Sequence, residues 1–242
     1  MKLKTDQDAV AVRRALALHA SPERAKSSAW FFKTGPGQYG EGDRFIGVTV
    51  PEQRRVASQY RTLPLSQIEQ LLNSPVHEHR LTALFILVYQ YQRAVKLNLE
   101  IETGTIVACY VVHRARVNNW DLVDSSAPFL LGAWLLNHDR SLLTTLARST
   151  NLWDRRIAIV ATHAFIRVGQ FEDTLRLASI LLGDQHDLIH KAVGWMLREV
   201  GKRDEAVLRQ FLNEHVAHMP RTMLRYALEK LPALDRHRYL SR

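Results

Sequence analysis

The segment DRRIAIVATHAFIRVG, residues 154–169, indicates the fold class, because similar segments recur along the chain. A basic residue, Arg156, opens it, and apolar residues such as Ile157 and Val160 follow at intervals of three and four, which is typical of a helix. The same pattern follows Arg80 in HRLTALFILVYQ (79–90), Lys191 in IHKAVGWMLREVGK (189–202) and Arg221 in PRTMLRYALEKL (220–231). The sequence therefore predicts similar helices at several places.

The spacing of these helices indicates a repeat. The four basic residues are separated by 76, 35 and 30 residues, and the first gap is about twice a repeat of 38. One helix pair cannot cover its own apolar face, but a row of pairs can. We therefore expect an all-α fold, a curved solenoid of stacked antiparallel helix pairs of the HEAT-like or armadillo type, with residues 1–242 as a single repeat domain. A basic residue repeated at one helix position would form a row of positive charge that follows a phosphate backbone.

Helix start signals and one loop complete the pattern. Ser21 before Pro22, and Val50 before Pro51, are typical of helix N-termini. RFIGVTV (44–50) is the only strand candidate. KTGPGQYGEGDRFIG (33–47) holds five glycines and one proline, which predicts a loop extending to about residue 50. This loop is either a connector or a backbone-rich segment beside a ligand. For residues 235–242 the sequence leaves open whether they form a flexible tail.

Composition limits the classes of function. Apolar residues make up 46% of the 242 residues, which excludes a disordered chain. The net charge of +9 favours an anionic partner, nucleic acid first and an anionic membrane surface second. No apolar run is long enough to span a bilayer, and the N-terminus lacks the core of a signal peptide. We therefore expect a cytoplasmic protein.

Metal and redox chemistry are not expected from the sequence. Cys109 is the only cysteine, so neither an intrachain disulfide nor a cysteine-based zinc site is predicted, and Cys109 is expected to pack in an apolar run. The histidine pairs His77 with His79 and His186 with His190 lack a third ligand at suitable spacing. We expect no metal and no cofactor.

The stretch NNWDLVDSS (118–126) places carboxylates beside an aromatic ring in this basic chain. Asn118 or Asn119 can cap a helix, which puts Asp121 in its first turn, where a structural role explains its charge. Asp124 lies four residues after Trp120, so both side chains emerge on one helical face. A carboxylate here would repel phosphates, but it makes sense if it faces a developing positive charge.

Four motifs in order resemble one family. They are FFKTGPGQYGEGDRFIGV (31–48) with PEQRR after it, WDLVD (120–124), RRIAI (155–159) and KAVGWMLRE (191–199). Together they are similar to the AlkD family of DNA alkylation repair glycosylases, which are built from HEAT-like repeats. The resemblance runs from about residue 20 to 230. Trp120 and Arg156 are separated by 36 residues, and Arg156 and Trp195 by 39.

The resemblance implies an activity and its residues. Members excise alkylated purines such as 3-methyladenine and 7-methylguanine by cutting the N-glycosidic bond. The catalytic aspartate corresponds to Asp124, the two tryptophans that contact the deoxyribose to Trp120 and Trp195, and the arginine that holds the backbone to Arg156. A carboxylate can stabilise an oxocarbenium-like sugar and orient water. An aromatic position that some members give to tyrosine falls on Trp30, Phe31 or Phe32.

The remaining expectations concern partners. Double-stranded DNA with alkylated bases is the expected partner, bound by a monomer associated with the nucleoid. Candidate phosphate contacts, each also explained as solvated charge, are Arg155, Lys191, Arg198, Arg221 and Arg225. Trp134 and Trp153 are expected to pack in the core. The alternative function is a non-catalytic HEAT-like module that binds DNA structures or a protein.

Overall fold

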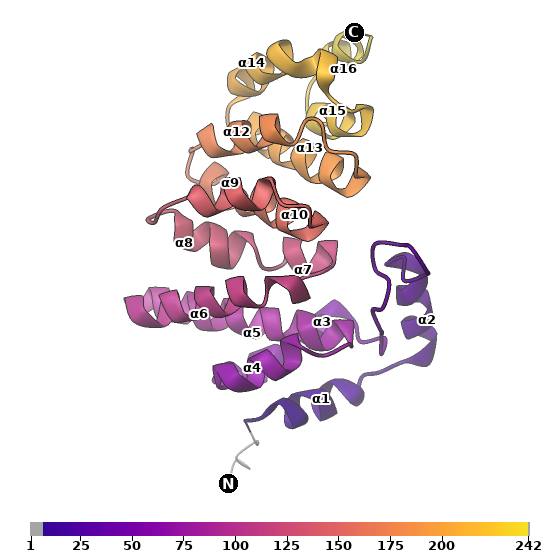
Figure 1. Cartoon of the computed structure of the whole chain (residues 1–242), viewed down its shortest axis with the longest axis vertical. Coiled ribbons are helices and arrows are strands. Elements are labelled where there is room, and N and C mark those ends of the chain that lie inside the picture. Colours follow the sequence, from indigo (N-terminus) through magenta and orange to yellow (C-terminus); the bar gives the residue numbers. More distant parts are fainter. Residues whose placement is uncertain (1–6, 242) are drawn as a thin grey trace. The chain divides into compact units, whose positions relative to one another are not determined.

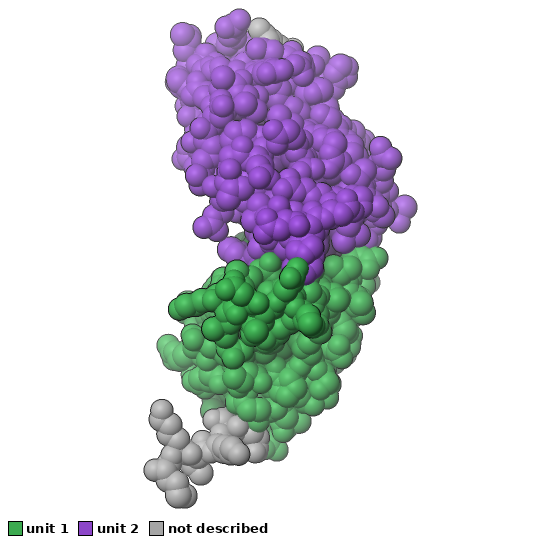
Figure 2. Space-filling view, turned by 90° about the vertical axis from the view of Figure 1, so that its left-hand side faces the viewer, with its two compact units in different colours: residues 1–126 green, residues 127–242 purple. Residues whose placement is uncertain are grey.

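The structure is a computed structural model that describes residues 7–241. The chain divides into two compact units, residues 1–126 and 127–242, shown in green and purple in Figure 2. Between residues 7 and 241 the regular structure is helical, and the only β-type pairing there is an isolated bridge between Arg44 and Val76. The predicted all-α class is confirmed, and the strand candidate forms loop instead. In a repeat array each repeat contacts only its neighbours, so a division into two compact units is compatible with one repeat domain. The single domain 1–242 therefore stays a prediction.

Unit 1 is built around one long central helix. Its helices are α1 (Ala9–Ala17), α2 (Pro22–Phe31), α3 (Val50–Gln59), α4 (Leu65–Leu72), α5 (His77–Lys96), α6 (Glu100–Val112), the 3-10 turn η1 (Arg114–Arg116) and α7 (Trp120–Asp124). The 20-residue α5 packs against α3, α4, α6 and α7 (Figure 1). Leu81, Leu84 and Phe85 of α5 are at most 1% exposed, so this helix forms the centre of the core.

Unit 2 repeats a helix-pair arrangement. It contains the π-helical turn η2 (Pro128–Gly132), α8 (Ala133–Leu135), α9 (Ser141–Ala147), α10 (Leu152–Ala161), α11 (His163–Ile166), α12 (Glu172–Ile180), α13 (Asp187–Gly201), α14 (Glu205–His215), the 3-10 turn η3 (Val216–His218), α15 (Arg221–Leu228) and α16 (Ala233–Leu240). Helix α10 packs on α9, and α13 packs on α10, α12, α14 and α15 (Figure 1). The segments that indicate the repeat in the sequence are α10, α13 and α15, the second helices of successive pairs.

Buried residues explain why these pairs adhere. Ile189, Val193, Met196 and Val200 recur at intervals of three or four along α13 and are fully buried. Gly194 lies on the same helix, where an added Cβ would stand 2.4 Å from the carbonyl oxygen of Met223 on α15. The absence of a side chain at this position therefore allows α13 and α15 to approach closely.

The N-cap of α2 is the residue predicted from the sequence, whereas the N-cap of α3 lies one residue earlier than predicted. The Ser21 hydroxyl accepts from the backbone N–H of Arg24 at 3.3 Å, and Pro22 opens α2 as predicted. At α3 the cap is Thr49, one residue before the predicted Val50. The Glu52 carboxylate accepts from the Thr49 backbone N–H at 3.1 Å, so a capping box replaces the expected cap.

The structure also tests the predictions on buried residues, on the C-terminal segment and on membrane spans. Cys109 and Trp153 are each 8% exposed, as expected of packing residues, whereas Trp134 is only partly buried. Most of the C-terminal segment 235–242 lies in α16, where Tyr239 is 4% exposed. In the part of the chain that the structure describes, no helix combines the length and the apolar character needed to cross a membrane.

Candidate functional site

Helix α7 carries two of the predicted site residues. The Asn119 side chain accepts from the backbone N–H of Trp120 at 2.9 Å, which confirms the predicted cap. Trp120 begins the helix and Asp124 ends it, one turn later on the same side. Both side chains are partly buried. The Asp124 carboxylate is therefore neither sealed in the core nor fully in solvent.

A cluster of aromatic rings holds Trp120 in place. We call Phe31, Phe32, Phe45, His77 and Trp120 the aromatic cluster. Phe32 stacks on Trp120 with ring centroids 5.3 Å apart, and Phe31 meets the same ring edge-on at 6.0 Å. Phe45 stacks on both Phe32, at 5.2 Å, and His77, at 4.6 Å. Rings from α2, the glycine-rich loop and α5 therefore fix the orientation of the indole.

Of the three aromatic residues proposed for the N-terminal position, two contact Trp120. Phe31 is 52% exposed and Phe32 is partly buried. Trp30 is 75% exposed, and its ring lies 5.0 Å from the Lys33 ammonium group. A hollow of about 660 Å³ is lined by Lys26, Ser27, Ser28, Trp30 and Phe31. Exposed rings and lysines thus share one side of α2.

His77 joins the glycine-rich loop to the start of α7. Its Nδ1 lies 3.1 Å from a carboxylate oxygen of Asp43, and its Nε2 lies 2.8 Å from a carboxylate oxygen of Asp121. Asp43 also accepts from Arg80 at 2.6 Å and from Asn119 at 3.3 Å. Since Asp121 is the neighbour of Trp120, this buried network fixes the first turn of the helix that carries Asp124.

The network shifts the ionisation of its members. Burial lowers the pKa of His77, but the charge and hydrogen bond of Asp121, together with the hydrogen bond of Asp43, outweigh it and raise the pKa from 6.5 to about 9. Burial raises the pKa of Asp43, but the His77 hydrogen bond and the Arg80 charge bring it below its usual value. Both ring nitrogens of His77 therefore donate at neutral pH, and each reaches a carboxylate.

The glycine-rich loop is built onto this network through Glu78. One Glu78 carboxylate oxygen accepts from the backbone N–H groups of Ile46 at 3.1 Å and Gly47 at 2.7 Å. Gly47 has φ +76°, and a Cβ there would stand 2.2 Å from the carbonyl oxygen of Ser21. Only glycine fits this conformation and this close approach. The loop thus lies against α2 and α5 and supplies Asp43 and Phe45 to the surroundings of Trp120.

Unit 2 carries the other two predicted site residues. Arg156 on α10 is 5% exposed, and its Nη1 donates to the carbonyl oxygen of Leu188 on α13 at 2.6 Å. Trp195 on α13 is partly buried, with its ring centroid 5.9 Å from that of His163. Burial lowers the pKa of His163, so this neighbour is neutral at physiological pH. Helices α10 and α13 pack against each other and position both residues.

The predicted phosphate contacts fall into two groups. Three have ion-pair partners: Arg155 reaches Asp184 at 2.6 Å, Lys191 reaches Asp187 at 2.7 Å, and Arg198 reaches Glu229. Arg221 and Arg225 are exposed on α15. Arg80, expected in the same row of charge, is 1% exposed and ion-paired with Asp43, so that expectation is wrong for Arg80. Its guanidinium lies inside unit 1.

The residues that support Trp120 do not emerge from the sequence. The sequence argues against His77 as a metal ligand, places Arg80 in a row of surface charge, and assigns no site role to Asp43, Phe45 and Glu78. The available signal is HEHR (77–80) at a helix start together with GDRF (42–45) in the glycine-rich loop. Charged residues at a helix start are usually solvated, so only the tertiary contacts reveal their burial.

Comparisons with known proteins agree with this architecture. The sequence profile of a family described as DNA alkylation repair enzyme matches residues 12–231. A solved structure described as a predicted DNA alkylation repair enzyme from Enterococcus faecalis is similar over 89% of this chain and 98% of its own, with a TM-score of 0.68 and 22% identity. AlkD2 from Streptococcus mutans is similar over 93% of this chain and 98% of its own, with a TM-score of 0.53 and 15% identity. No curated protein sequence matches the chain significantly.

Proposed function

Because the chain belongs to the DNA alkylation repair enzyme family, we propose that it is a DNA glycosylase that hydrolyses the N-glycosidic bond of cationic alkylated purines. 3-Methyladenine and 7-methylguanine are the expected substrates. The single observation that carries the proposal is the pairing on α7 of Trp120, held by Phe31 and Phe32, with Asp124 one turn away. A fixed ring beside a partly exposed carboxylate suits a transient cation.

The reaction needs little help at the base. An alkylated purine carries a positive charge, so the base takes the bonding electrons as the N-glycosidic bond breaks and leaves neutral. The deoxyribose then becomes oxocarbenium-like. The Asp124 carboxylate stabilises this charge and orients a water molecule, whose oxygen bonds to C1′ while one of its protons passes to solvent. The products are a free methylpurine and an abasic sugar.

The aromatic rings serve the same charge. An indole face attracts a cation through the ring quadrupole, by about 0.5–2 kcal/mol, with the upper end requiring desolvation. Trp120 meets that condition in part, because Phe31 and Phe32 pack on its ring. By the family resemblance, Trp195 contacts the deoxyribose and Arg156 the phosphate backbone. No extruded-base pocket is required by these roles, so the enzyme would select lesions by bond lability more than by shape.

Besides Arg156, which is 5% exposed, exposed basic residues are assigned to phosphate binding. Arg221 and Arg225 on α15, and Lys26 and Lys33 beside the exposed Trp30, are available to an anionic partner. Such contacts position a protein on DNA and are weakened by salt. The net charge of +9 supplies the long-range attraction.

The test is direct. Purified protein is incubated with DNA treated with a methylating agent, and released bases are separated and quantified. Release of methylpurines above the spontaneous rate supports the glycosylase. DNA binding without release would favour the alternative, a non-catalytic module.

A further inference from the structure

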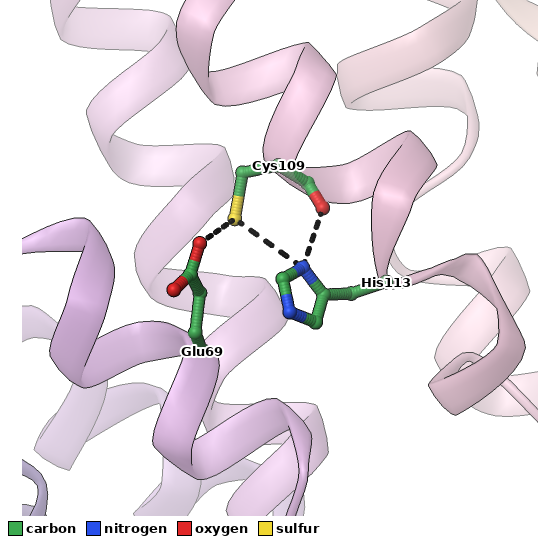
Figure 3. A group of neighbouring side chains, drawn as sticks. All are labelled: Glu69, Cys109 and His113. Carbon is green, nitrogen blue, oxygen red and sulfur yellow. Dashed lines mark hydrogen bonds between the residues drawn. The ribbon is translucent and has the colours of Figure 1, made fainter.

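Three side chains with metal-binding atoms meet on α4 and α6 of unit 1 (Figure 3). Glu69 projects from α4, Cys109 from α6, and His113 is the C-cap residue that follows α6. None of them belongs to the aromatic cluster or to the Asp43 network. They offer a carboxylate oxygen, a thiol sulfur and an imidazole nitrogen.

The three donor atoms converge on one point. The Cys109 sulfur lies 4.0 Å from a Glu69 carboxylate oxygen and 3.9 Å from the Nδ1 of His113. All three atoms lie within 4.8 Å of one another. Figure 3 shows the carboxylate from α4 and the imidazole at the end of α6 next to the sulfur, with dashed lines marking the two contacts. In a tetrahedral zinc site a sulfur and a nitrogen ligand are about 3.6 Å apart, given metal bonds of about 2.3 and 2.0 Å. The two distances to the sulfur exceed this spacing by a few tenths of an ångström, so the carboxylate and the imidazole must move towards the sulfur to bind one ion.

The helices hold the donors in this arrangement. Cys109 and His113 are four residues apart, so their side chains share one helical face. Helix α4 packs against α6 and brings Glu69 to that face. Cys109 is 8% exposed, while Glu69 and His113 are partly exposed, so solvent and ions reach the group. The His113 Nδ1 lies 3.0 Å from the Cys109 carbonyl oxygen, a contact that a metal ion would replace.

We propose that Glu69, Cys109 and His113 form a zinc site that ties α4 to α6, with a water molecule as fourth ligand. One thiolate, one imidazole and one carboxylate suit Zn²⁺, whereas Mg²⁺ and Ca²⁺ prefer oxygen ligands. The thiol proton passes to solvent when the sulfur binds the ion. The site joins segments 40 residues apart in the sequence, so occupancy stabilises unit 1 against unfolding.

Cobalt titration of the full chain tests this site independently of any DNA activity. Protein stripped with a chelator is titrated with Co²⁺, and the thiolate-to-cobalt charge-transfer band is recorded. Cys109 is the only cysteine, so this band reports on one sulfur. We expect saturation at one Co²⁺ per chain, displacement by Zn²⁺, and a rise in Tm with Zn²⁺.

Variants decide whether the three residues act together. Cys109→Ser should abolish the band, and Glu69→Gln and His113→Gln should each weaken cobalt binding by at least about tenfold. His237→Gln, at an exposed histidine of α16, is the matched control and should bind like the parent. Glu69→Gln keeps the test valid if Cys109→Ser fails to fold, because Glu69 is partly exposed.

Three results overturn the proposal. One is the absence of a thiolate band at saturating Co²⁺. Another is saturation at half an equivalent, which indicates a metal shared between two chains. The last is a band that Glu69→Gln and His113→Gln leave unchanged.

Discussion

The Nε2 of His77 lies 2.8 Å from a carboxylate oxygen of Asp121, the residue that follows Trp120. The other ring nitrogen reaches Asp43 in the glycine-rich loop at 3.1 Å. One buried imidazole therefore connects two segments that are far apart in the sequence. The position of α7, and with it that of the proposed catalytic carboxylate, depends on this imidazole.

Protonated His77 makes stability depend on pH. Its pKa is raised from 6.5 to about 9 in the folded chain. A group with a raised folded pKa contributes stability that is complete below the unfolded pKa and lost as the pH passes the folded one. We expect the free energy of unfolding to fall between pH 6.5 and 9. Chemical denaturation of the parent and of His77→Gln across this range measures the effect.

His77→Gln should flatten the dependence in that window, whereas His218→Gln, an exposed histidine of unit 2, should preserve it. Equal pH profiles for the parent and His77→Gln would rule out His77 as the titrating group.

Two glycines of the glycine-rich loop distinguish the cost of a left-handed backbone from the cost of a steric clash. Gly37 has φ +72° and open space where a Cβ would stand, while Gly47 has φ +76° and the carbonyl oxygen of Ser21 only 2.2 Å from that position. Gly37→Ala should cost only the strain of a left-handed residue, roughly 1–2 kcal/mol. Gly47→Ala should cost more, because α2 must move as well. Thermal unfolding of the two variants compares them, and equal losses would contradict the close packing of the loop on α2.

Phe32 should support excision through Trp120. Phe32→Leu removes the ring that stacks on the indole at 5.3 Å. We expect single-turnover excision to slow several-fold at saturating enzyme, since the indole loses its fixed orientation. Phe211→Leu, a buried ring of α14 in unit 2, controls for a general loss of packing. An unchanged rate for Phe32→Leu would show that the stack is not needed.

Arg155 and Arg221 test which basic residues meet DNA. Arg221 is exposed, so Arg221→Ala should reduce the salt dependence of DNA binding by about one phosphate contact. Arg155 is paired with Asp184 and also donates to the Thr150 carbonyl oxygen at 2.9 Å. Arg155→Ala should instead lower the stability of unit 2 with little change in the salt slope. The opposite pattern in binding measured against salt would exchange their roles.

The helix pairs could be predicted because each has its own signal. The three- and four-residue spacing of apolar residues marks α10, α13 and α15, and Asn119 indicates the start of α7. The pairing of Trp120 with Asp124 on one face also follows from local geometry. Sequence alone therefore predicts the all-α class and the arrangement of Trp120 and Asp124 on α7.

Tertiary contacts could not be predicted in this way. Asp43 meets His77 across 34 residues, and Glu69 meets Cys109 across 40. Neither separation corresponds to a helix period, so the sequence contains no signal for the buried network. Closely spaced histidines likewise do not indicate the group of Glu69, Cys109 and His113. From the sequence, Arg80 is expected at the surface because its ion-pair partner, Asp43, lies in a loop whose position the sequence does not reveal.

The rate of methylpurine release by Asp124→Asn tests whether the Asp124 carboxylate drives excision. Single-turnover release of 7-methylguanine is measured for the parent, for Asp124→Asn, and for Asp139→Asn at an exposed aspartate of unit 2. We predict an active parent, an unaffected Asp139→Asn, and a loss of about 10²-fold or more in Asp124→Asn with DNA binding retained. Equal release by Asp124→Asn and the parent would show that the Asp124 carboxylate does not drive excision.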